Sequence, residues 1–202
     1  MKISNKGLDL IKHFESFKAS PYKCVAGVDT IGYGSTKYEN GRKVTLKDKP
    51  ITEARATKLL LNTVIIYEAV VLKEFKGVGL TQDMFDGLVS FAYNTGSFKF
   101  NRGRSTYTFA SYIKAPIPKD EPWDFYKKDV VDFMMKVSKY YDRKTSSYKT
   151  ANGLRRRRMS ELILMYTGEL VYYAKGNWDA DKKSNDYERD TGYKVYKELG
   201  LL

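Results

Sequence analysis

The spacing of apolar residues changes twice within the first 75 residues, and this change limits the chain to a mixed fold. Helical spacing over residues 5–15 gives way to glycine-rich, β-favouring sequence over residues 19–49, and helical spacing returns after Thr52, a plausible N-cap. Apolar positions repeat every 3.6 residues in a helix and every two in a strand. The sequence therefore predicts a helix, a small antiparallel sheet and a long helix, which is an α+β fold.

The predicted first helix ends with a carboxyl group on its apolar side. Leu8, Ile11 and Glu15 follow the i, i+3, i+7 spacing of one helical face, with Ser4 or Asn5 as the N-cap. At about 100° per residue, Glu15 falls within about 20° of Leu8. Contact with the following sheet would partly desolvate the carboxyl group, and desolvation favours the protonated form that a general acid needs.

Two further reactive side chains, Cys24 and Thr30, fall in the predicted sheet. Their thiol and hydroxyl groups could orient a water molecule, while Gly32 and Gly34 let a bulky substrate approach the backbone. Spacing alone favours a simpler interpretation, in which the sheet holds a buried free cysteine and turn glycines, next to a glutamate at a helix edge.

Several classes of site are disfavoured by composition. Cys24 and His13 are the only cysteine and the only histidine, so we expect no intramolecular disulfide and no protein metal site. Charged residues interrupt the N-terminus, which does not read as a secretory signal, and no apolar run reaches the roughly 18 residues of a membrane span.

The formal net charge of +12 predicts attraction to polyanions. Nucleic acid, anionic lipid and an acidic cell wall all satisfy it, so charge alone leaves three classes of protein open: an enzyme acting on the wall, a nucleic-acid-binding protein and a membrane-active cationic protein. The run Arg155–Arg158 also fits a nucleic-acid patch or a solvated helix face.

The order of several motifs resembles the phage-type lysozymes, glycoside hydrolase family 24. The signature consists of a glutamate, eight residues, a cysteine, five residues and Thr-Ile-Gly-Tyr-Gly, beginning at Glu15. It is followed by Thr-Glu-Ala at 52–54, FDGLVSFAYNTG at 85–96 and NGLRRRRMSE at 152–161, in the family's order. The resemblance covers about residues 4–168.

The resemblance implies a reaction and roles for three residues. Glu15 would protonate the leaving glycosidic oxygen, and Cys24 and Thr30 would hold the attacking water. The family cleaves the β-1,4 bond between N-acetylmuramic acid and N-acetylglucosamine in peptidoglycan, with inversion and without a cofactor. Many members carry aspartate at the position of Cys24. Because inverting hydrolysis normally uses two carboxyl groups, we expect Cys24 to position water rather than to act as a strong base.

Further positions are carried over from the family in the same way. Gly34, Tyr93, Asn94 and Ser105 match positions that contact the saccharide. Only one arginine of the run 155–158 is expected to face inward. The family pattern indicates Arg156, which would pair with Glu15 and fix its rotamer.

The resemblance also implies a lysozyme-like architecture of two lobes with a cleft between them. The expected organisation is a catalytic lobe at 1–52, a connecting helix at 53–75, a helical lobe at 76–168 and a C-terminal extension at 169–202, packed on the second lobe. We expect a monomeric endolysin that acts on peptidoglycan glycan strands and the anionic wall surface, with no nucleic acid as partner. It would be made in the host cytoplasm and reach the wall after holin-type release.

Overall fold

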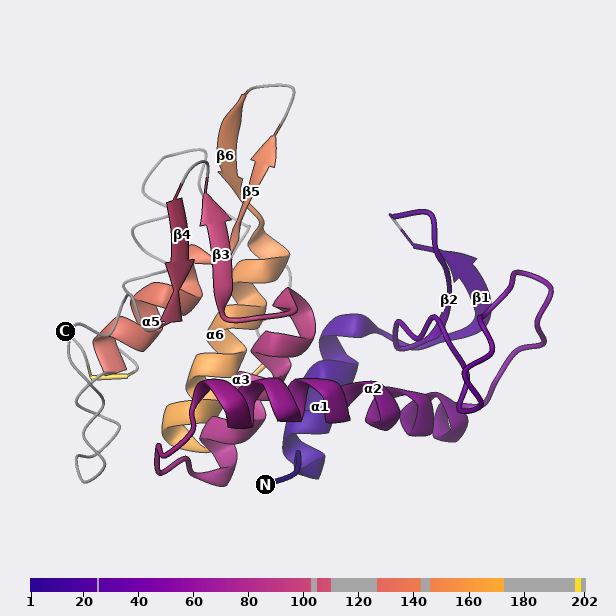
Figure 1. Ribbon diagram of the computed structural model, residues 1–202, viewed down its shortest axis with the longest axis horizontal. Helices are drawn as coiled ribbons and strands as arrows, with labels where there is room; N and C mark the ends of the chain where they lie inside the picture. Colours follow the sequence, from indigo (N-terminus) through magenta and orange to yellow (C-terminus); the bar gives the residue numbers. More distant parts are fainter. Residues whose placement is uncertain (25, 103–104, 110–126, 143–145, 173–198, 201–202) are drawn as a thin grey trace.

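The computed structural model describes residues 1–24, 26–102, 105–109, 127–142, 146–172 and 199–200. A long helix, α2 (Glu53–Glu74), runs between the hairpin of β1 (Lys18–Lys23) and β2 (Asp29–Gly32) at one end of the molecule and a group of helices at the other (Figure 1). This arrangement confirms the predicted fold class: a small antiparallel sheet and a mainly helical part, joined by a long helix.

Helix α1 spans Asn5–Glu15 and begins as predicted at an N-cap, Ser4, whose side chain accepts a hydrogen bond from the Gly7 amide. Leu8, Leu10 and Ile11 are buried, so the predicted apolar stripe is the packed face. The helix ends at Glu15 because Ser16 takes φ 58° and ψ 136°, a backbone conformation that interrupts helical geometry.

The N-terminal segment ties this helix to two others. The Ile3 amide donates to Glu68 Oε1 of α2 at 2.7 Å, and the Ser4 amide donates to Asp86 Oδ1 of α3 at 2.9 Å. The Ser4 hydroxyl also binds the Asp86 carboxylate. Both carboxylates are buried and each has a backbone donor, which offsets the cost of removing them from water.

Strands β1, Lys18–Lys23, and β2, Asp29–Gly32, form an antiparallel hairpin in which Tyr22 lies opposite Thr30 and Lys23 opposite Asp29. Gly32 has φ +67°, and a Cβ atom there would lie 2.9 Å from the Cβ of Ala56 in α2. The missing side chain therefore lets the hairpin pack closely on the start of α2.

Helix α2 spans Glu53–Glu74 and helix α3 spans Gln82–Thr95. Thr52, the predicted N-cap, caps α2, and Thr81 caps α3; their side chains accept hydrogen bonds from the Arg55 and Met84 amides, respectively. Gly96 ends α3 in the left-handed region at φ 80°.

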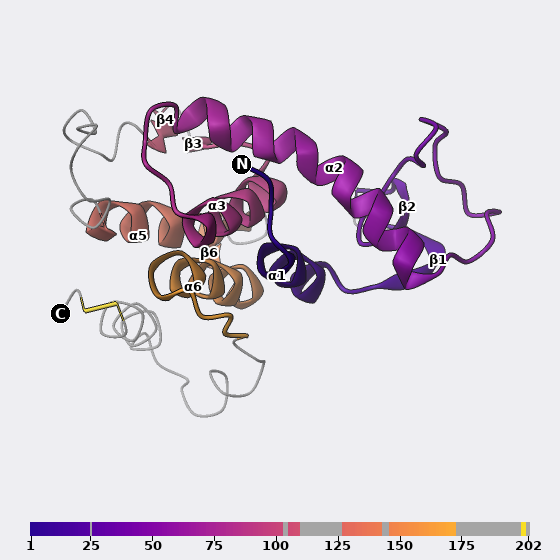
Figure 2. The same cartoon turned by 90° about the horizontal axis from the view of Figure 1, so that it is seen from below.

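Helices α5, Lys127–Lys136, and α6, Asn152–Thr167, complete the helical part. Seen from below, α1, α3 and α6 pack side by side beneath α2 (Figure 2). A Cβ atom on Gly87 of α3 would lie 2.9 Å from the Glu161 carbonyl oxygen of α6, so these two helices touch through their backbones. The core between the elements includes six buried phenylalanines: Phe75, Phe85, Phe91, Phe98, Phe109 and Phe133.

From residue 97 to about residue 166 the sequence predicts further helix, broken only by the proline-rich segment at 114–122, and the structure shows that this prediction is wrong in two places. Strands β3, Lys99–Arg102, and β4, Ser105–Thr108, form one hairpin, and β5, Lys139–Asp142, and β6, Ser147–Thr150, form another. Their sequences are rich in tyrosine, threonine and phenylalanine, which favour strands. Ser146 takes φ 47° in the second turn.

Candidate active site

Glu15 lies at the C-terminal end of α1 and faces an arginine of α6. Arg157 Nη1 is 2.6 Å from Glu15 Oε1, with 25% of the Glu15 side chain and 4% of the Arg157 side chain exposed. The C-terminal end of a helix carries partial negative charge and disfavours an anion, so Arg157 offsets the dipole of α1. The part of the Glu15 carboxyl group that does not contact Arg157 remains open to solvent.

The Arg157 guanidinium is fixed by contacts on both sides. Its Nε donates to Glu161 Oε1 at 3.1 Å, and its Nη2 donates to the Ser90 carbonyl oxygen at 3.2 Å. Glu161 is fully buried and also accepts from the Ser90 hydroxyl at 2.8 Å. The partner of Glu15 is therefore held by α3 and α6 before any substrate binds.

The arginine that pairs with Glu15 is Arg157, so the prediction of Arg156 is wrong by one residue. The expectation of a single inward arginine is also wrong, because Arg155, Arg157 and Arg158 are all buried, with 8%, 3% and 0% exposed. The physical reason is the close approach of α3 and α6, which provides acceptors on α3 for two successive guanidinium groups. One step on a helix turns a side chain by about 100°, so an error of one residue changes the contact.

Arg158 is the second of these arginines and binds a predicted site residue. Its Nη2 donates to Asn94 Oδ1 at 3.0 Å and to Glu161 Oε1 at 3.1 Å, and its guanidinium lies 4.6 Å from the centre of the Phe91 ring. Burial lowers the pKa of Arg158 to about 10. Asn94 is exposed, but its side-chain oxygen is already bound.

The predicted site residues Cys24 and Thr30 lie on one face of the hairpin, together with Tyr22. Tyr22 lies opposite Thr30, and the Cys24 amide donates to the Val28 carbonyl oxygen at 3.0 Å, which extends the same register by two residues. Alternate residues share one face of a strand pair, so the three side chains lie on one face. Burial raises the pKa of Tyr22, and the negative charges of Glu15 and Cys24 raise it further.

Cys24 is half-buried, and its local backbone favours the thiolate. The backbone N–H groups of Val28 and Ala26 lower the pKa of the Cys24 thiol, and the Thr30 hydroxyl lowers it by a smaller amount. Thr30 is buried and its Oγ1 donates to the Val28 carbonyl oxygen at 2.9 Å. At a given pH, more of this sulfur is therefore in the thiolate form than in an ordinary cysteine.

Gly34 and Tyr93 lie beside the carboxyl group of Glu15. A Cβ atom on Gly34 would lie 3.9 Å from Glu15 Oε2 and 3.5 Å from Tyr93 Oη, and Gly34 has φ +96°. The Tyr93 hydroxyl donates to the Tyr33 carbonyl oxygen at 2.9 Å. Burial raises the pKa of Tyr93, with a further increase from the charge of Glu15. Ser105 belongs to β4, and its side chain lies outside the described residues.

Sequence reasoning missed Tyr22, Ser90, Arg157 and Glu161. The signal for Tyr22 is its i, i+2 spacing from Cys24 on a strand, and the signal for Glu161 is its i+3 and i+4 spacing from two arginines. His13, which the sequence assigns to surface or packing, is exposed and stacks on Tyr172 with ring centres 4.0 Å apart.

The sequence model of the family described as Phage lysozyme matches residues 12–120. The chain belongs to the phage lysozyme family. This membership confirms the resemblance drawn from the motifs beginning at Glu15. The matched range includes the hairpin, α2 and α3, and it contains the predicted site residues except the α6 arginine.

Relatives of this family member include the endolysin of Bacillus phage B103, which is 34% identical over 171 residues, 84% of this chain and 56% of that protein. The endolysin of Acyrthosiphon pisum secondary endosymbiont phage 1 is 36% identical over 50% of this chain and 64% of that protein. The chain thus spans a little over half the length of these curated relatives. The solved structure of the endolysin from Escherichia coli O157:H7 phage FAHEc1 superposes with a TM-score of 0.64, at 30% identity over 86% of this chain and 98% of that chain.

The described residues also bear on membrane-spanning segments and metal sites. No helix among them is long and apolar enough to cross a membrane. Within the same part of the chain, no group of three or more histidine, cysteine, aspartate or glutamate side chains is placed to hold a metal ion.

Proposed function

We propose that this chain is an endolysin of the lysozyme type, which hydrolyses the β-1,4 bond between N-acetylmuramic acid and N-acetylglucosamine in peptidoglycan. The observation that carries the proposal is the position of Glu15: a partly exposed carboxyl group, held by a buried arginine and bordered by Gly34. Family membership and relatives that are themselves named endolysins support it.

Glu15 is the proposed general acid. When it gives its proton to the leaving glycosidic oxygen, it becomes a carboxylate, and the Arg157 guanidinium at 2.6 Å stabilises that product of proton transfer. The same contact holds one rotamer of Glu15. The unbound part of the carboxyl group faces the space beside Gly34, where the absence of a side chain leaves room for the sugar.

Cys24 and Thr30 are the proposed positioning groups for the attacking water. The thiol and hydroxyl lie on one face of the hairpin, and the lowered pKa of Cys24 allows the sulfur to accept a hydrogen bond from water and to take its proton late in the reaction. A water on the face of the sugar opposite the general acid gives inversion.

The proposed saccharide contacts are Gly34, Tyr93 and Asn94, with Ser105 from β4. Tyr93 supplies a half-buried aromatic edge next to Glu15, and the amide nitrogen of Asn94 is available to an N-acetyl carbonyl while its oxygen binds Arg158. In this proposal the substrate lies in a cleft between a lobe at 1–52 and a helical lobe at 76–168, joined by the helix at 53–75. The protein acts as a monomer on the wall after holin-type release.

The alternative of a nucleic-acid-binding protein loses one of its three supports, which are the net charge of +12, the 17 tyrosines and the arginine run. Three of the four arginines in that run are buried, and two of these bind Glu15, Ser90, Asn94 or Glu161. The remaining positive charge is equally suited to the carboxylates and phosphates of a bacterial wall.

The decisive experiment compares wild type with Glu15→Gln on purified peptidoglycan. We expect turbidity to clear with wild type and to persist with a folded Glu15→Gln variant, and mass spectrometry to find hydrated reducing muramic ends. Equal clearing by both proteins would remove Glu15 as the acid. Anhydro-muramic ends would indicate a lytic transglycosylase, and intact glycan with continued bacterial killing would indicate a membrane-active protein.

A further inference from the structure

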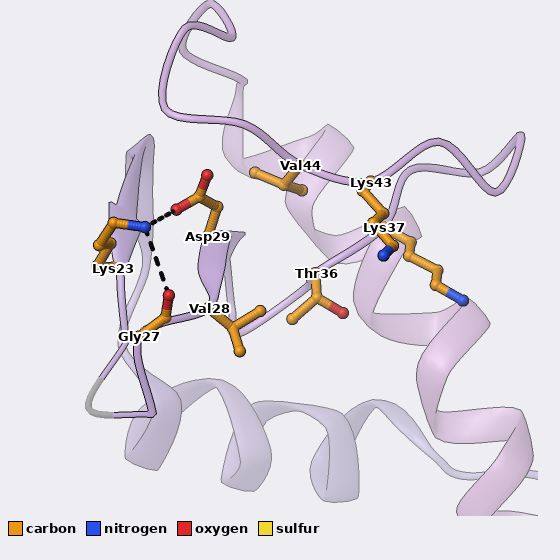
Figure 3. A pocket seen from close by; sticks show the side chains of 8 residues that line it. All are labelled: Lys23, Gly27, Val28, Asp29, Thr36, Lys37, Lys43 and Val44. Atoms are coloured by element: carbon orange, nitrogen blue, oxygen red, sulfur yellow. Dashed lines mark hydrogen bonds and ion pairs between the residues drawn. The ribbon is translucent and has the colours of Figure 1, made fainter.

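The outer side of the β1–β2 hairpin holds a pocket of about 320 Å³ that the proposed reaction does not use. One wall comes from the hairpin and the other from the loop that follows it (Figure 3). The volume lies near the lower end of the range of about 300–1,000 Å³ for small-ligand sites. Its lining residues are Lys23, Gly27, Val28, Asp29, Thr36, Lys37, Lys43 and Val44.

The pocket is separate from the candidate active site. Lys23 and Asp29 are cross-strand partners that directly follow and precede the partners Tyr22 and Thr30. Adjacent residues on a strand point to opposite faces, so Lys23 and Asp29 lie behind the face that carries the proposed catalytic groups. Val28 lines the pocket from the other face, but none of the residues assigned to the candidate active site is among the lining residues.

Two lysines of the pocket oppose each other directly across an isolated antiparallel bridge. Lys37 pairs with Lys43, and the hydrogen bonds on either side run from the Tyr38 amide to the Arg42 carbonyl and from the Val44 amide to the Thr36 carbonyl, both 2.9 Å. This pattern makes Lys37 and Lys43 a non-hydrogen-bonded pair, the closest cross-strand arrangement. Like charges at such a position repel each other.

The acidic groups near this pair are already bound to other cations. Asp29 Oδ1 lies 2.8 Å from Lys23 Nζ, and Asp48 Oδ1 lies 3.0 Å from Arg42 Nη1. Across the described part of the chain, Lys37 and Lys43 have no carboxylate within ion-pair distance. The pocket lining carries three lysines and one aspartate, a local charge of +2, so an entering anion meets net attraction even though Asp29 opposes it.

We propose that this pocket binds a phosphodiester group of an anionic cell-wall polymer. Lysine ammonium groups bind phosphate oxygens as point charges, and an anion between Lys37 and Lys43 would relieve their repulsion. Val28 and Val44 add apolar surface for the short carbon units on either side of the phosphate. The described lining contains no aromatic side chain on which a nucleic-acid base could stack, which favours a wall polymer over nucleic acid.

The assignment to a wall polymer rests on the proposed function, whereas binding of the anion can be tested without catalysis. The probe is soluble poly(glycerol phosphate), titrated into ¹⁵N-labelled protein and followed by the amide shifts of Gly27, Lys37 and Lys43. We expect saturable shifts at these amides. In Lys37→Gln/Lys43→Gln, affinity should fall about tenfold, which corresponds to about 1.4 kcal/mol.

The matched control is Lys73→Gln/Lys76→Gln, which makes the same change of net charge at the far end of α2 and just beyond it. It should lose less than about twofold in affinity. Equal weakening of both double variants, or shifts located away from the pocket, would show a general charge effect and overturn the proposal. Stronger shifts with duplex or single-stranded DNA at the same amides would assign the pocket to nucleic acid instead.

A second measurement separates this proposal from the proposed function. Lys37→Gln/Lys43→Gln should hydrolyse phosphate-free glycan oligosaccharides at the wild-type rate and show reduced clearing only of walls that retain their phosphate polymer. Hydrolysis by neither protein would contradict the lysozyme assignment while leaving anion binding intact. Equal clearing of phosphate-rich and phosphate-stripped walls by both proteins would reject the wall polymer as the ligand.

Discussion

Replacing Glu161 by glutamine should destabilise the protein more strongly than any surface charge change. The Glu161 carboxylate is fully buried between two guanidinium groups, with Oε1 3.1 Å from Arg157 Nε and Oε2 2.9 Å from Arg158 Nε. Loss of its charge leaves both buried arginines with one carboxylate, Glu15, which contacts only the first of them. Removing one partner of a buried ion pair costs about 3–5 kcal/mol.

The expected effect on melting temperature follows from that cost. A chain of 150–250 residues loses about 2–4 °C per kcal/mol, so Glu161→Gln should lower Tm by about 6–20 °C. The lower half of that range is expected, because glutamine retains one oxygen that can accept from the Ser90 hydroxyl. Thermal unfolding followed by circular dichroism at pH 7 measures the change.

Two controls test the reasoning. Glu169→Gln removes an exposed carboxylate just beyond α6 and should change stability by less than about 0.5 kcal/mol. In the double variant Arg158→Met/Glu161→Gln, one buried positive charge disappears together with the negative charge, so its Tm should exceed the value expected from the sum of the single changes. A Glu161→Gln variant that melts like Glu169→Gln would refute the assignment of Glu161 as the counter-ion of this cluster.

Three smaller changes probe the surroundings of the site. Gly34→Ala places a methyl group 3.9 Å from Glu15 Oε2 at φ +96°, so unfolding assays should show a loss of about 1–3 kcal/mol and turbidity assays a loss of activity. Ser16→Gly relieves the backbone at φ 58° and should raise stability by about 1 kcal/mol, detectable as a higher Tm. Thr30→Val removes a hydroxyl that helps to lower the pKa of Cys24. The midpoint of the pH dependence of the reaction between the thiol and iodoacetamide should therefore move to higher pH, and an unchanged pH profile would exclude that contribution.

The helices that position the acid could be predicted because their signals are local. Thr52 caps its helix as expected, and Ser4, one of the two candidates named for the first helix, is the residue that caps it. A cap depends on the residues of one turn, which the sequence states directly. The placement of Glu15 at the end of the first helix follows from the same signals.

The α6 contacts could not be predicted with the same certainty, because they depend on how closely two distant segments approach. Arg156 and Arg157 differ by one step on a helix, and only the packing of α6 against α3 decides which of them reaches Glu15. The two hairpins after α3 were missed for a related reason. Short strands of four residues carry too few positions to show a period of two.

Helix α1 also determines which parts of the site would move together. Bonds from Ile3 and Ser4 to α2 and α3, and the Glu15–Arg157 pair, attach both ends of this helix to the helical bundle. The sulfur of Cys24 belongs instead to the hairpin, which begins two residues after Ser16 and rests on the first turn of α2 through Gly32. A change in the curvature of α2 would therefore alter the distance between Glu15 and Cys24 while the Glu15–Arg157 ion pair stayed intact.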